Sequence, residues 1–378
     1  MACNLSESKQ LGSMAEMQQL NDNLLSLKIA EEAQTASPSS CLTDSPDHWD
    51  YNAEGDGAQS QWREFNSFMD KKARTRPYPK YLYRAHVHGH PFPRLPDVFE
   101  GEYSDSFGSD LHLWCEDDAQ TQMFMPIGDL MDNYTVEDLF WHLNLHLGKT
   151  CINLQPNSHG EQPFLSPLVS LSGDFRWTAQ RICRVGRMIS KDRDQMPGLA
   201  IFKTSNINPS GVRVYRVEDM LSFLNTRLAE SSVHISSQRQ GWAKNADEYV
   251  CWSLVPRDAL AAFTPLAELI ETSNGGDEAF LTKGFVDSNY LGDFRQLSRV
   301  HPVHISVEEY AERASRFMHN IIANVSSLEE AKQLCMDMER VLLNPDIWGY
   351  GVAKSVQGLD ETISSSLEKV LETAFMVK

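Results

Sequence analysis

The chain has 378 residues, of which 41% are apolar, and it carries a net charge of −18 at neutral pH. This length and composition suffice for one large domain with extensions, or for two domains, with a sizeable core. The negative charge argues against sequence-independent binding to nucleic acid or to an anionic membrane, because both require a basic surface. No apolar run approaches the length that is needed to span a bilayer.

The seven cysteines are scattered and never spaced as C-x-x-C. This pattern argues against a disulfide framework and against a structural zinc site. The first residues lack the basic stretch and following apolar stretch of a secretory signal. The sequence therefore predicts a protein of the cytoplasm, the nucleus or both.

Residues 1–75 are rich in Ser, Asn, Gln, Asp and Glu, and we expect a mostly disordered N-terminal arm. One segment, Met14 to Ala33, has apolar residues at helical spacing. Within it, Leu20, Leu24, Leu27 and Ile29 have the spacing of a leucine-rich nuclear export signal, whose apolar anchors would enter a groove of an export receptor. The alternative is a short helix that docks on the rest of its own protein.

Folded structure is predicted to begin near Pro77 with a strand at Tyr81–Val87, because aromatic and apolar residues are dense there. Residues 89–134 hold many Gly, Pro, Asp and Ser and predict a long irregular connection. Strands and helices then alternate. The predicted helices are Val136–Leu147, Phe175–Met188 and Glu218–Leu228, and the predicted strands are Phe164–Leu171, Leu199–Lys203, Val212–Tyr215 and Glu248–Val255. The last strand is apolar on both faces, which favours an interior position in a sheet.

A third region, residues 276–378, is predicted to be helical and to stand apart from the sheet. Its helices are expected at Ser306–Asn324, Ser327–Leu342 and Leu359–Phe375. The first two begin with Ser followed three residues later by Glu, which is the capping-box pattern. Phe317, Ile321 and Ile322 require burial, so this region is expected to pack on the preceding domain.

Three predicted strands each carry polar residues among apolar neighbours: Arg84, then Ser170 with Ser172, then Glu248. The order Arg…Ser-x-Ser…Glu resembles the ADP-ribosyltransferase-like superfamily. It is most similar to a fungal branch, a domain of unknown function in which an "LFR" strand is followed by "SPFIS" and later by an "EE" or "DE" strand. The resemblance covers about half of the chain, roughly residues 76–265. It implies an α+β fold for residues 76–275, with a split β-sheet and flanking helices.

The resemblance further implies that NAD is the substrate. A carboxylate, Glu248, would stabilise the positive charge that develops on the ribose when nicotinamide leaves. The guanidinium of Arg84 would bind phosphates or ribose. Ser170, supported by Ser172, would brace the glutamate and leave room for nicotinamide, so the resemblance assigns Arg84, Ser170 and Ser172 to cofactor binding. Phe175, Trp177 or Tyr249 could stack on nicotinamide. Two of these residues also have an ordinary structural interpretation. Arg84 could be an arginine at a strand end that forms a salt bridge, and Glu248 could be a solvated acid at the start of a strand.

Two positions depart from the active patterns of this superfamily. Ala246 stands where enzymes that modify arginine usually carry Glu or Gln, and Leu171 replaces a usual Thr. These departures leave three possibilities open: another protein acceptor of unknown identity, NAD hydrolysis, or a catalytically inactive interaction module. Such a module would bind protein partners through the helical tail and the N-terminal segment.

Two groups of histidines invite a metal interpretation. His86, His88 and His90 alternate along a predicted strand, and no further ligand completes a tetrahedral set. His142 and His146 lie four residues apart on a predicted helix, but the glutamate of a zinc protease is missing between them. No metal site is therefore predicted, and the helix that carries the second pair is expected to pack on the sheet.

Overall fold

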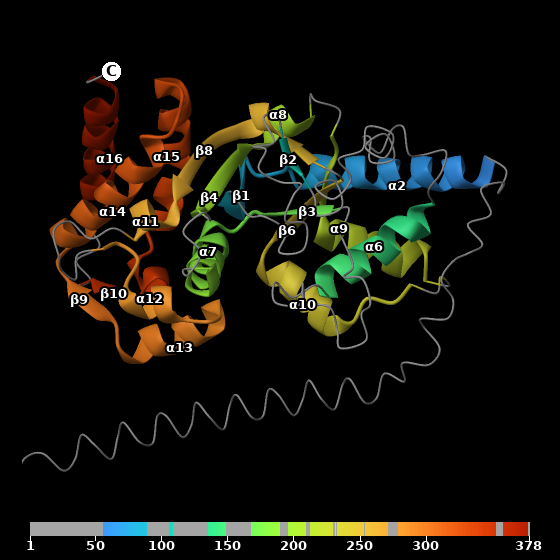
Figure 1. The fold of residues 1–378 in the computed structure, drawn as a ribbon, viewed down its shortest axis with the longest axis horizontal. Coiled ribbons are helices and arrows are strands. Elements are labelled where there is room, and N and C mark those ends of the chain that lie inside the picture. Colours follow the sequence, from blue (N-terminus) through green and yellow to red (C-terminus); the bar gives the residue numbers. More distant parts are fainter. Residues whose placement is uncertain are drawn as a thin grey trace, which may run out of the picture. The chain divides into compact units, whose positions relative to one another are not determined.

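The structure of this chain is a computed structural model, and it describes residues 56–88, 106–108, 135–148, 168–189, 196–208, 212–229, 231, 233–252, 254–270, 279–352 and 358–376 (Figure 1). The predicted export segment and the histidine at position 90 lie outside the described residues. None of the helices within these ranges is both long enough and apolar enough to cross a membrane.

Six strands in the described part of the chain form one antiparallel sheet in the order β5-β6-β3-β1-β4-β8. Their apolar side chains alternate between two buried faces, as strand geometry requires. The strands are β1 (Tyr81–His88), β3 (Leu168–Ser172), β4 (Met196–Lys203), β5 (Val214–Arg216), β6 (Glu248–Trp252) and β8 (Leu260–Pro265). The interior position of β6, between β5 and β3, agrees with its apolar pattern on both faces.

The centre of this sheet is weakly paired. β1 and β4 pair along their full length, from Tyr81 opposite Lys203 to His88 opposite Met196. In contrast, β1 and β3 share a single pair, Tyr83 opposite Ser172. The sheet therefore consists of two well-paired halves, β5-β6-β3 and β1-β4-β8, that part immediately after their one point of contact.

Different helices cover the two halves on one face of the sheet (Figure 1). The half that contains β6 packs against α2, α6 and α9, whereas β1, β4 and β8 pack against α7 and the C-terminal helices. The helices are α2 (Asp56–Thr75), α6 (Val136–Gly148), α7 (Phe175–Ile189), α8 (Thr204–Ile207), α9 (Val217–Arg227), α10 (Ser237–Asn245), α11 (Leu266–Leu269), α12 (Lys283–Asp287), α13 (Leu291–Val300), α14 (Val307–Ile322), α15 (Leu328–Leu342) and α16 (Leu359–Met376). On the other face of the sheet, side chains from both halves form one apolar layer, which includes Leu82, Val169 and Tyr249.

Helix α2 corrects the prediction that folded structure begins near Pro77, because this helix spans Asp56–Thr75. Trp62, Phe65 and Met69 follow one another at helical spacing and are almost completely buried. Phe65 packs edge-on against Phe140 of α6 and Phe223 of α9. Residues 56–75 are therefore not disordered as predicted, because this otherwise polar segment carries one apolar stripe that packs into the core.

The C-terminal region confirms its predicted helices. The side chains of Ser306 and Ser327 accept hydrogen bonds from the backbone N–H groups of Glu309 and Glu330, which caps α14 and α15. Two short strands that were not predicted, β9 (Val303–Ile305) and β10 (Tyr350–Val352), pair with each other in parallel and not with the six-stranded sheet. One further strand pair joins β2 (Ser106–Gly108) to β7 (Leu254–Pro256).

This region is part of the core of the preceding domain rather than a separate unit. Phe317, Ile321 and Ile322 are buried in the same apolar cluster as Tyr83 of β1 and Phe175 of α7. Phe175 packs edge-on against Phe317, with 5.9 Å between ring centroids. The predicted boundary at residue 275 therefore separates elements of the sheet from helices that cover it.

Candidate functional site

The side chains of Ser170 and Glu248 meet on neighbouring strands. β3 and β6 are paired so that Ser172 lies opposite Glu248 and Ser170 opposite Val250. All four residues share one face of the sheet, because directly opposed residues of an antiparallel pair point to the same side. On this face the hydroxyl of Ser170 donates a hydrogen bond to Oε1 of Glu248, at 2.8 Å. The structure thus brings together two of the predicted site residues.

A third member of this group is His146, from α6. Its Nε2 lies 2.6 Å from Oγ of Ser170 and 3.7 Å from Oε1 of Glu248. Its side chain is only 10% exposed. Sequence reasoning considered this histidine only as part of a metal pair with His142. The signal that was available is its place beside Leu143 and Leu147, which belong to the buried face of α6.

Arg84 reaches the group from the other side of the sheet. Its backbone lies opposite Ala200, and it alternates with Tyr83, so its Cα–Cβ bond points to the face opposite Ser170 and Ser172. Its guanidinium nevertheless donates from Nη1 to the main-chain oxygen of Ser170, at 2.8 Å. The contact is possible because β1 and β3 share only one pair, at Tyr83 and Ser172. Arg84 thus departs from the expectation that it would join Ser170 and Glu248 in one site, since its side chain leaves β1 on the opposite face.

Ser172 has a supporting position. Its hydroxyl donates to the main-chain oxygen of Ala246 and accepts the N–H of Asp174 at 3.0 Å. The residue is 2% exposed. These bonds tie the end of β3 to the residues that precede β6, so Ser172 positions Glu248 and does not face a ligand as a predicted cofactor-binding residue would.

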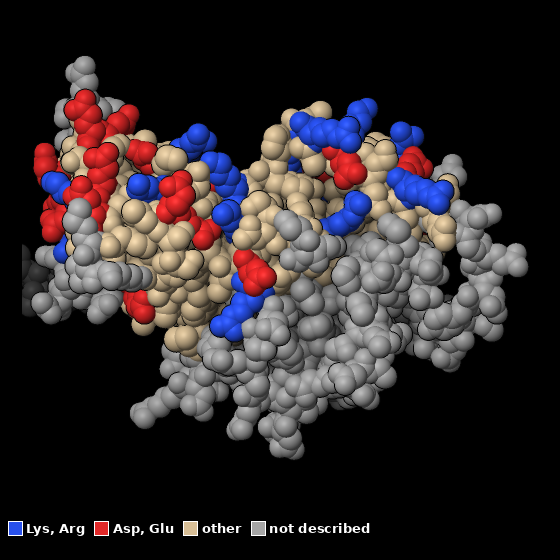
Figure 2. Space-filling view, turned by 90° about the horizontal axis from the view of Figure 1, so that it is seen from above, with Lys and Arg blue, Asp and Glu red and all other residues tan. Residues whose placement is uncertain are grey.

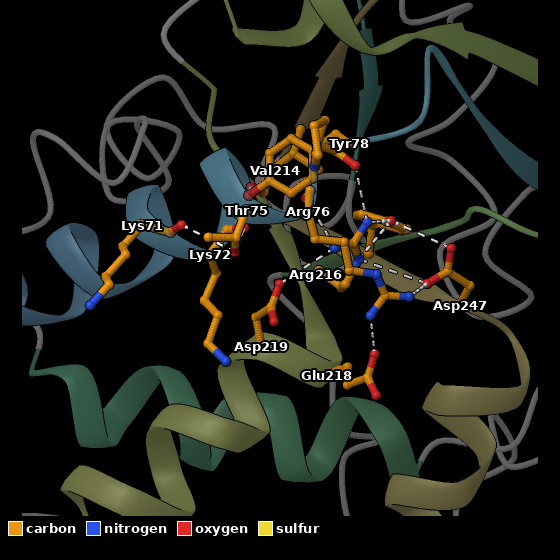
Figure 3. Close-up of polar contacts among 12 residues, drawn as sticks. Lys71, Lys72, Thr75, Arg76, Tyr78, Val214, Arg216, Glu218, Asp219 and Asp247 are labelled. Carbon is orange, nitrogen blue, oxygen red and sulfur yellow. Dashed lines mark hydrogen bonds and ion pairs between the residues drawn. The ribbon is translucent and has the colours of Figure 1, made fainter.

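The turn before Glu248 has an unusual backbone. Asp247 has φ of 40°, the one positive φ of a residue other than glycine within the described ranges. Its carboxylate is held at 3.8 Å from Nε of Arg216 and from Nη2 of Arg76 (Figure 3). Arg216 in turn donates to the hydroxyl of Tyr249. Two arginines thus fix the turn that sets the direction in which Glu248 enters the sheet.

Two of the three aromatic residues that were predicted to stack on nicotinamide are buried in the core. Tyr249 is buried, and its hydroxyl is bonded to Arg216. Phe175 is buried against Tyr83, with 5.2 Å between ring centroids. Trp177 is half-buried against the same cluster. Phe175 and Tyr249 are therefore excluded as residues that stack on a ligand.

Burial sets the protonation of this group. It raises the pKa of Glu248 to about 7, and the hydrogen bond from Ser170 and the charge of Arg181 oppose that shift. Burial also lowers the pKa of His146 to about 4, with a further contribution from the charge of Arg84. The imidazole is therefore neutral at neutral pH, and its 3.7 Å approach to Glu248 is not an ion pair there. A carboxyl group that titrates near pH 7 can accept or donate a proton under physiological conditions.

No cluster of three or more His, Cys, Asp or Glu side chains with the geometry of a metal site occurs among the described residues. The ring of His142 packs against Trp252, at 5.7 Å between centroids. Cys183 and Cys251 are buried, and burial raises the pKa of both thiols, so neither is reactive.

No protein-family model matches this chain, and neither the curated proteins nor the solved structures include a significant match to it.

Proposed function

We propose that this chain consumes NAD, as an ADP-ribosyltransferase or an NAD glycohydrolase on an ADP-ribosyltransferase-like fold, with Glu248 as its catalytic residue. The observation that carries the proposal is the 2.8 Å hydrogen bond from Ser170 to Glu248. It joins two residues of the Arg…Ser-x-Ser…Glu pattern on adjacent strands. The parting of β1 and β3 beside them supports the split sheet that the resemblance implies.

The reaction breaks the bond between the ribose C1′ and the nicotinamide nitrogen, and nicotinamide leaves with the bonding electron pair. Positive charge then develops on the ribose. The ionised carboxylate of Glu248 stabilises that charge, and Ser170 holds the carboxylate in place through its hydroxyl. Water or a nucleophilic side chain of a protein acceptor forms the new bond to C1′ and gives up a proton. Glu248 can take that proton because its pKa lies near 7.

Arg84 contributes to this site through the strand that it holds. The resemblance implies that its guanidinium binds the phosphates or ribose of the dinucleotide, whereas here its side chain leaves β1 on the face opposite Glu248. Its bond to the main-chain oxygen of Ser170 adds a second role, which is to keep the serine in register beside Glu248.

The test is to incubate the full chain with NAD labelled separately in nicotinamide and in adenylate. Nicotinamide release reports cleavage, and transfer of the adenylate label to protein separates transferase from hydrolase. Glu248→Gln keeps the shape but removes the charge, and it should lower the rate on the order of a hundredfold or more. Glu312→Gln, at a 70% exposed side chain on α14, is the matched control and should not change it. An inactive wild-type chain, or equal rates for wild type and Glu248→Gln, would contradict the proposal.

The second candidate is an interaction module without catalysis, and the surface of the C-terminal region favours it. Four large apolar side chains are exposed in and around α13. They are Tyr290 (48% exposed), Leu297 (44%), Val300 (69%) and Val303 (38%). Acidic side chains gather over the C-terminal helices (Figure 2), where Glu329 begins α15 and Asp360 and Glu361 begin α16. An acidic surface disfavours nucleic acid there and favours a protein partner. This candidate predicts that the wild-type chain releases no nicotinamide and that Leu297→Glu with Val300→Glu abolishes a partner complex.

A further inference from the structure

His146, Ser170 and Glu248 form a continuous hydrogen-bonded chain from α6 to β6. The imidazole Nε2 is 2.6 Å from the serine Oγ, and that oxygen is 2.8 Å from Oε1 of the glutamate. The two end groups are 10% and 14% exposed, so water does not dominate their environment. A serine hydroxyl has one proton to donate, and here it has acceptors on both sides.

With a neutral imidazole, the hydrogen-bonded group His146–Ser170–Glu248 can exist in two states that differ in where the hydrogens lie. When Glu248 is ionised, Ser170 must donate to it, and Nε2 of His146 must carry hydrogen in order to donate to Ser170. When Glu248 is protonated on Oε1, it donates to Ser170, Ser170 donates to Nε2, and the imidazole hydrogen must be on Nδ1. The second state holds one proton more than the first, and that proton comes from solvent.

We propose that His146 is a positioning residue for Glu248, and that its tautomer follows the protonation state of that carboxyl group through Ser170. With hydrogen on Nε2, His146 directs the hydroxyl of Ser170 toward Glu248 and stabilises the carboxylate. With hydrogen on Nδ1, it stabilises the neutral acid. The hydrogen bonds through Ser170 therefore couple the tautomer of His146, on α6, to the charge of Glu248.

The charged groups around the chain support this behaviour. From α7, Arg181 favours the ionised form of Glu248, and burial favours the neutral form, so that the pKa lies at about 7. From β1, Arg84 disfavours an imidazolium at His146. On β6, the adjacent Asp247 is compensated by Arg216 and Arg76. His146 therefore responds to Glu248 by exchanging tautomers rather than by taking up charge.

The consequence for catalysis rests on the proposed function. Only the state with hydrogen on Nε2 presents an ionised Glu248 to a ribose cation, so NAD cleavage should rise with pH through the same midpoint as the tautomer exchange. The inference itself needs no NAD.

The experiment is nitrogen NMR of the full chain labelled with ¹⁵N-histidine, in which the two ring nitrogens distinguish both neutral tautomers from imidazolium. The titration runs from about pH 5.5 to about pH 8.5. The signal of His146 is assigned from its loss in His146→Gln. We expect a neutral ring throughout, with hydrogen moving from Nδ1 to Nε2 within about one unit of pH 7.

Two variants keep the inference falsifiable if one of them fails to fold. Glu248→Gln has no titrating carboxyl group, and Ser170→Ala interrupts the chain, so in each the exchange at His146 should disappear. A wild-type His146 with one fixed tautomer across the range, or one that forms imidazolium near pH 6.5, overturns the inference, as does an exchange that survives in either variant. An exchange in a protein that releases no nicotinamide would uphold the inference and reject the proposed function.

Discussion

The N–H of Gly173 donates to the main-chain oxygen of Asp247 at 2.8 Å. This bond joins the residue after β3 to the residue before β6. Together with the bond from Ser172 to Ala246, it fixes the ends of the two strands that carry Ser170 and Glu248. The candidate site is thus positioned from one end by two consecutive residues, Ser172 and Gly173.

The first prediction concerns the close approach at this position. A Cβ on Gly173 would lie 2.1 Å from Oδ2 of Asp247, whose carboxylate Arg216 and Arg76 hold in place. Gly173→Ala should therefore destabilise the protein by about 1–3 kcal/mol in urea unfolding. The control is Gly241→Ala in α10, where a Cβ meets nothing within 4 Å. That change should be neutral or stabilise the protein by up to about 1 kcal/mol, and equal destabilisation by both would contradict the account.

The second prediction concerns the pH dependence of stability. The pKa of Glu248 is raised from 4.5 to about 7 in the folded protein, so the folded state binds more protons than the unfolded state between these values. The contribution of this group to stability is therefore present below pH 4.5 and is lost as pH rises to about 7. Glu248→Gln lacks this loss, so the stability of the variant relative to wild type should rise by up to about 3 kcal/mol across this window.

The measurement for this second prediction is the free energy of unfolding in urea at several pH values. The contribution of His146, whose lowered pKa acts in the opposite direction, is present in both proteins and largely cancels in the difference. Glu312→Gln provides the baseline, because that side chain is 70% exposed. A difference between Glu248→Gln and wild type that stays constant with pH would show that Glu248 is not titrating in this range.

The third prediction concerns the guanidinium that bridges the middle of the sheet. Arg84→Leu removes the donor to the main-chain oxygen of Ser170 and should cost about 1–3 kcal/mol. It also removes a positive charge that lowers the pKa of His146, so that pKa should rise. Arg227→Leu removes an exposed arginine that pairs with Glu64 at 3.5 Å, and it should cost less than about 1 kcal/mol. An unchanged midpoint for Arg84→Leu would assign no structural role to that contact.

The fourth prediction concerns the C-terminal helices. Phe317 is 3% exposed and contacts Phe175 of the sheet-covering helix α7 and Phe280. Phe317→Ala should cost about 3–5 kcal/mol and destabilise the sheet and the C-terminal helices together. Coincident unfolding curves from tryptophan fluorescence and far-ultraviolet circular dichroism would agree with this expectation. Two separated transitions would show that residues 276–378 fold on their own.

Much of the fold could be predicted because local patterns carry it. The dense aromatic and apolar residues located β1, the segment that is apolar on both faces located β6, and the capping serines located α14 and α15. The proximity of Ser170 and Glu248 was expected from the resemblance, in which both strands contribute to one site, and the register of β3 and β6 places the two residues on the same face.

The remaining features depend on tertiary contacts that no local pattern encodes. α2 was missed because its sequence is mostly polar, and its stripe is meaningful only against Phe140 and Phe223. His146 was missed because a histidine at the border of an apolar helix face acquires its role from the strand that it meets. The route of Arg84 through the sheet could not be predicted either, since it requires β1 and β3 to part after one pair.

Because β1 and β3 share a single pair, the backbone hydrogen bonds of the sheet are concentrated in its two halves. Amide hydrogens of β1 and β4 are protected by a full ladder, and those of β3 and β6 by another, but very few hydrogen bonds join these two ladders. Separating the two halves would also have to disrupt the apolar layer that they share, which includes Leu82, Val169 and Tyr249. Even so, amide hydrogens along the β1–β3 line should exchange with solvent faster than those inside either ladder.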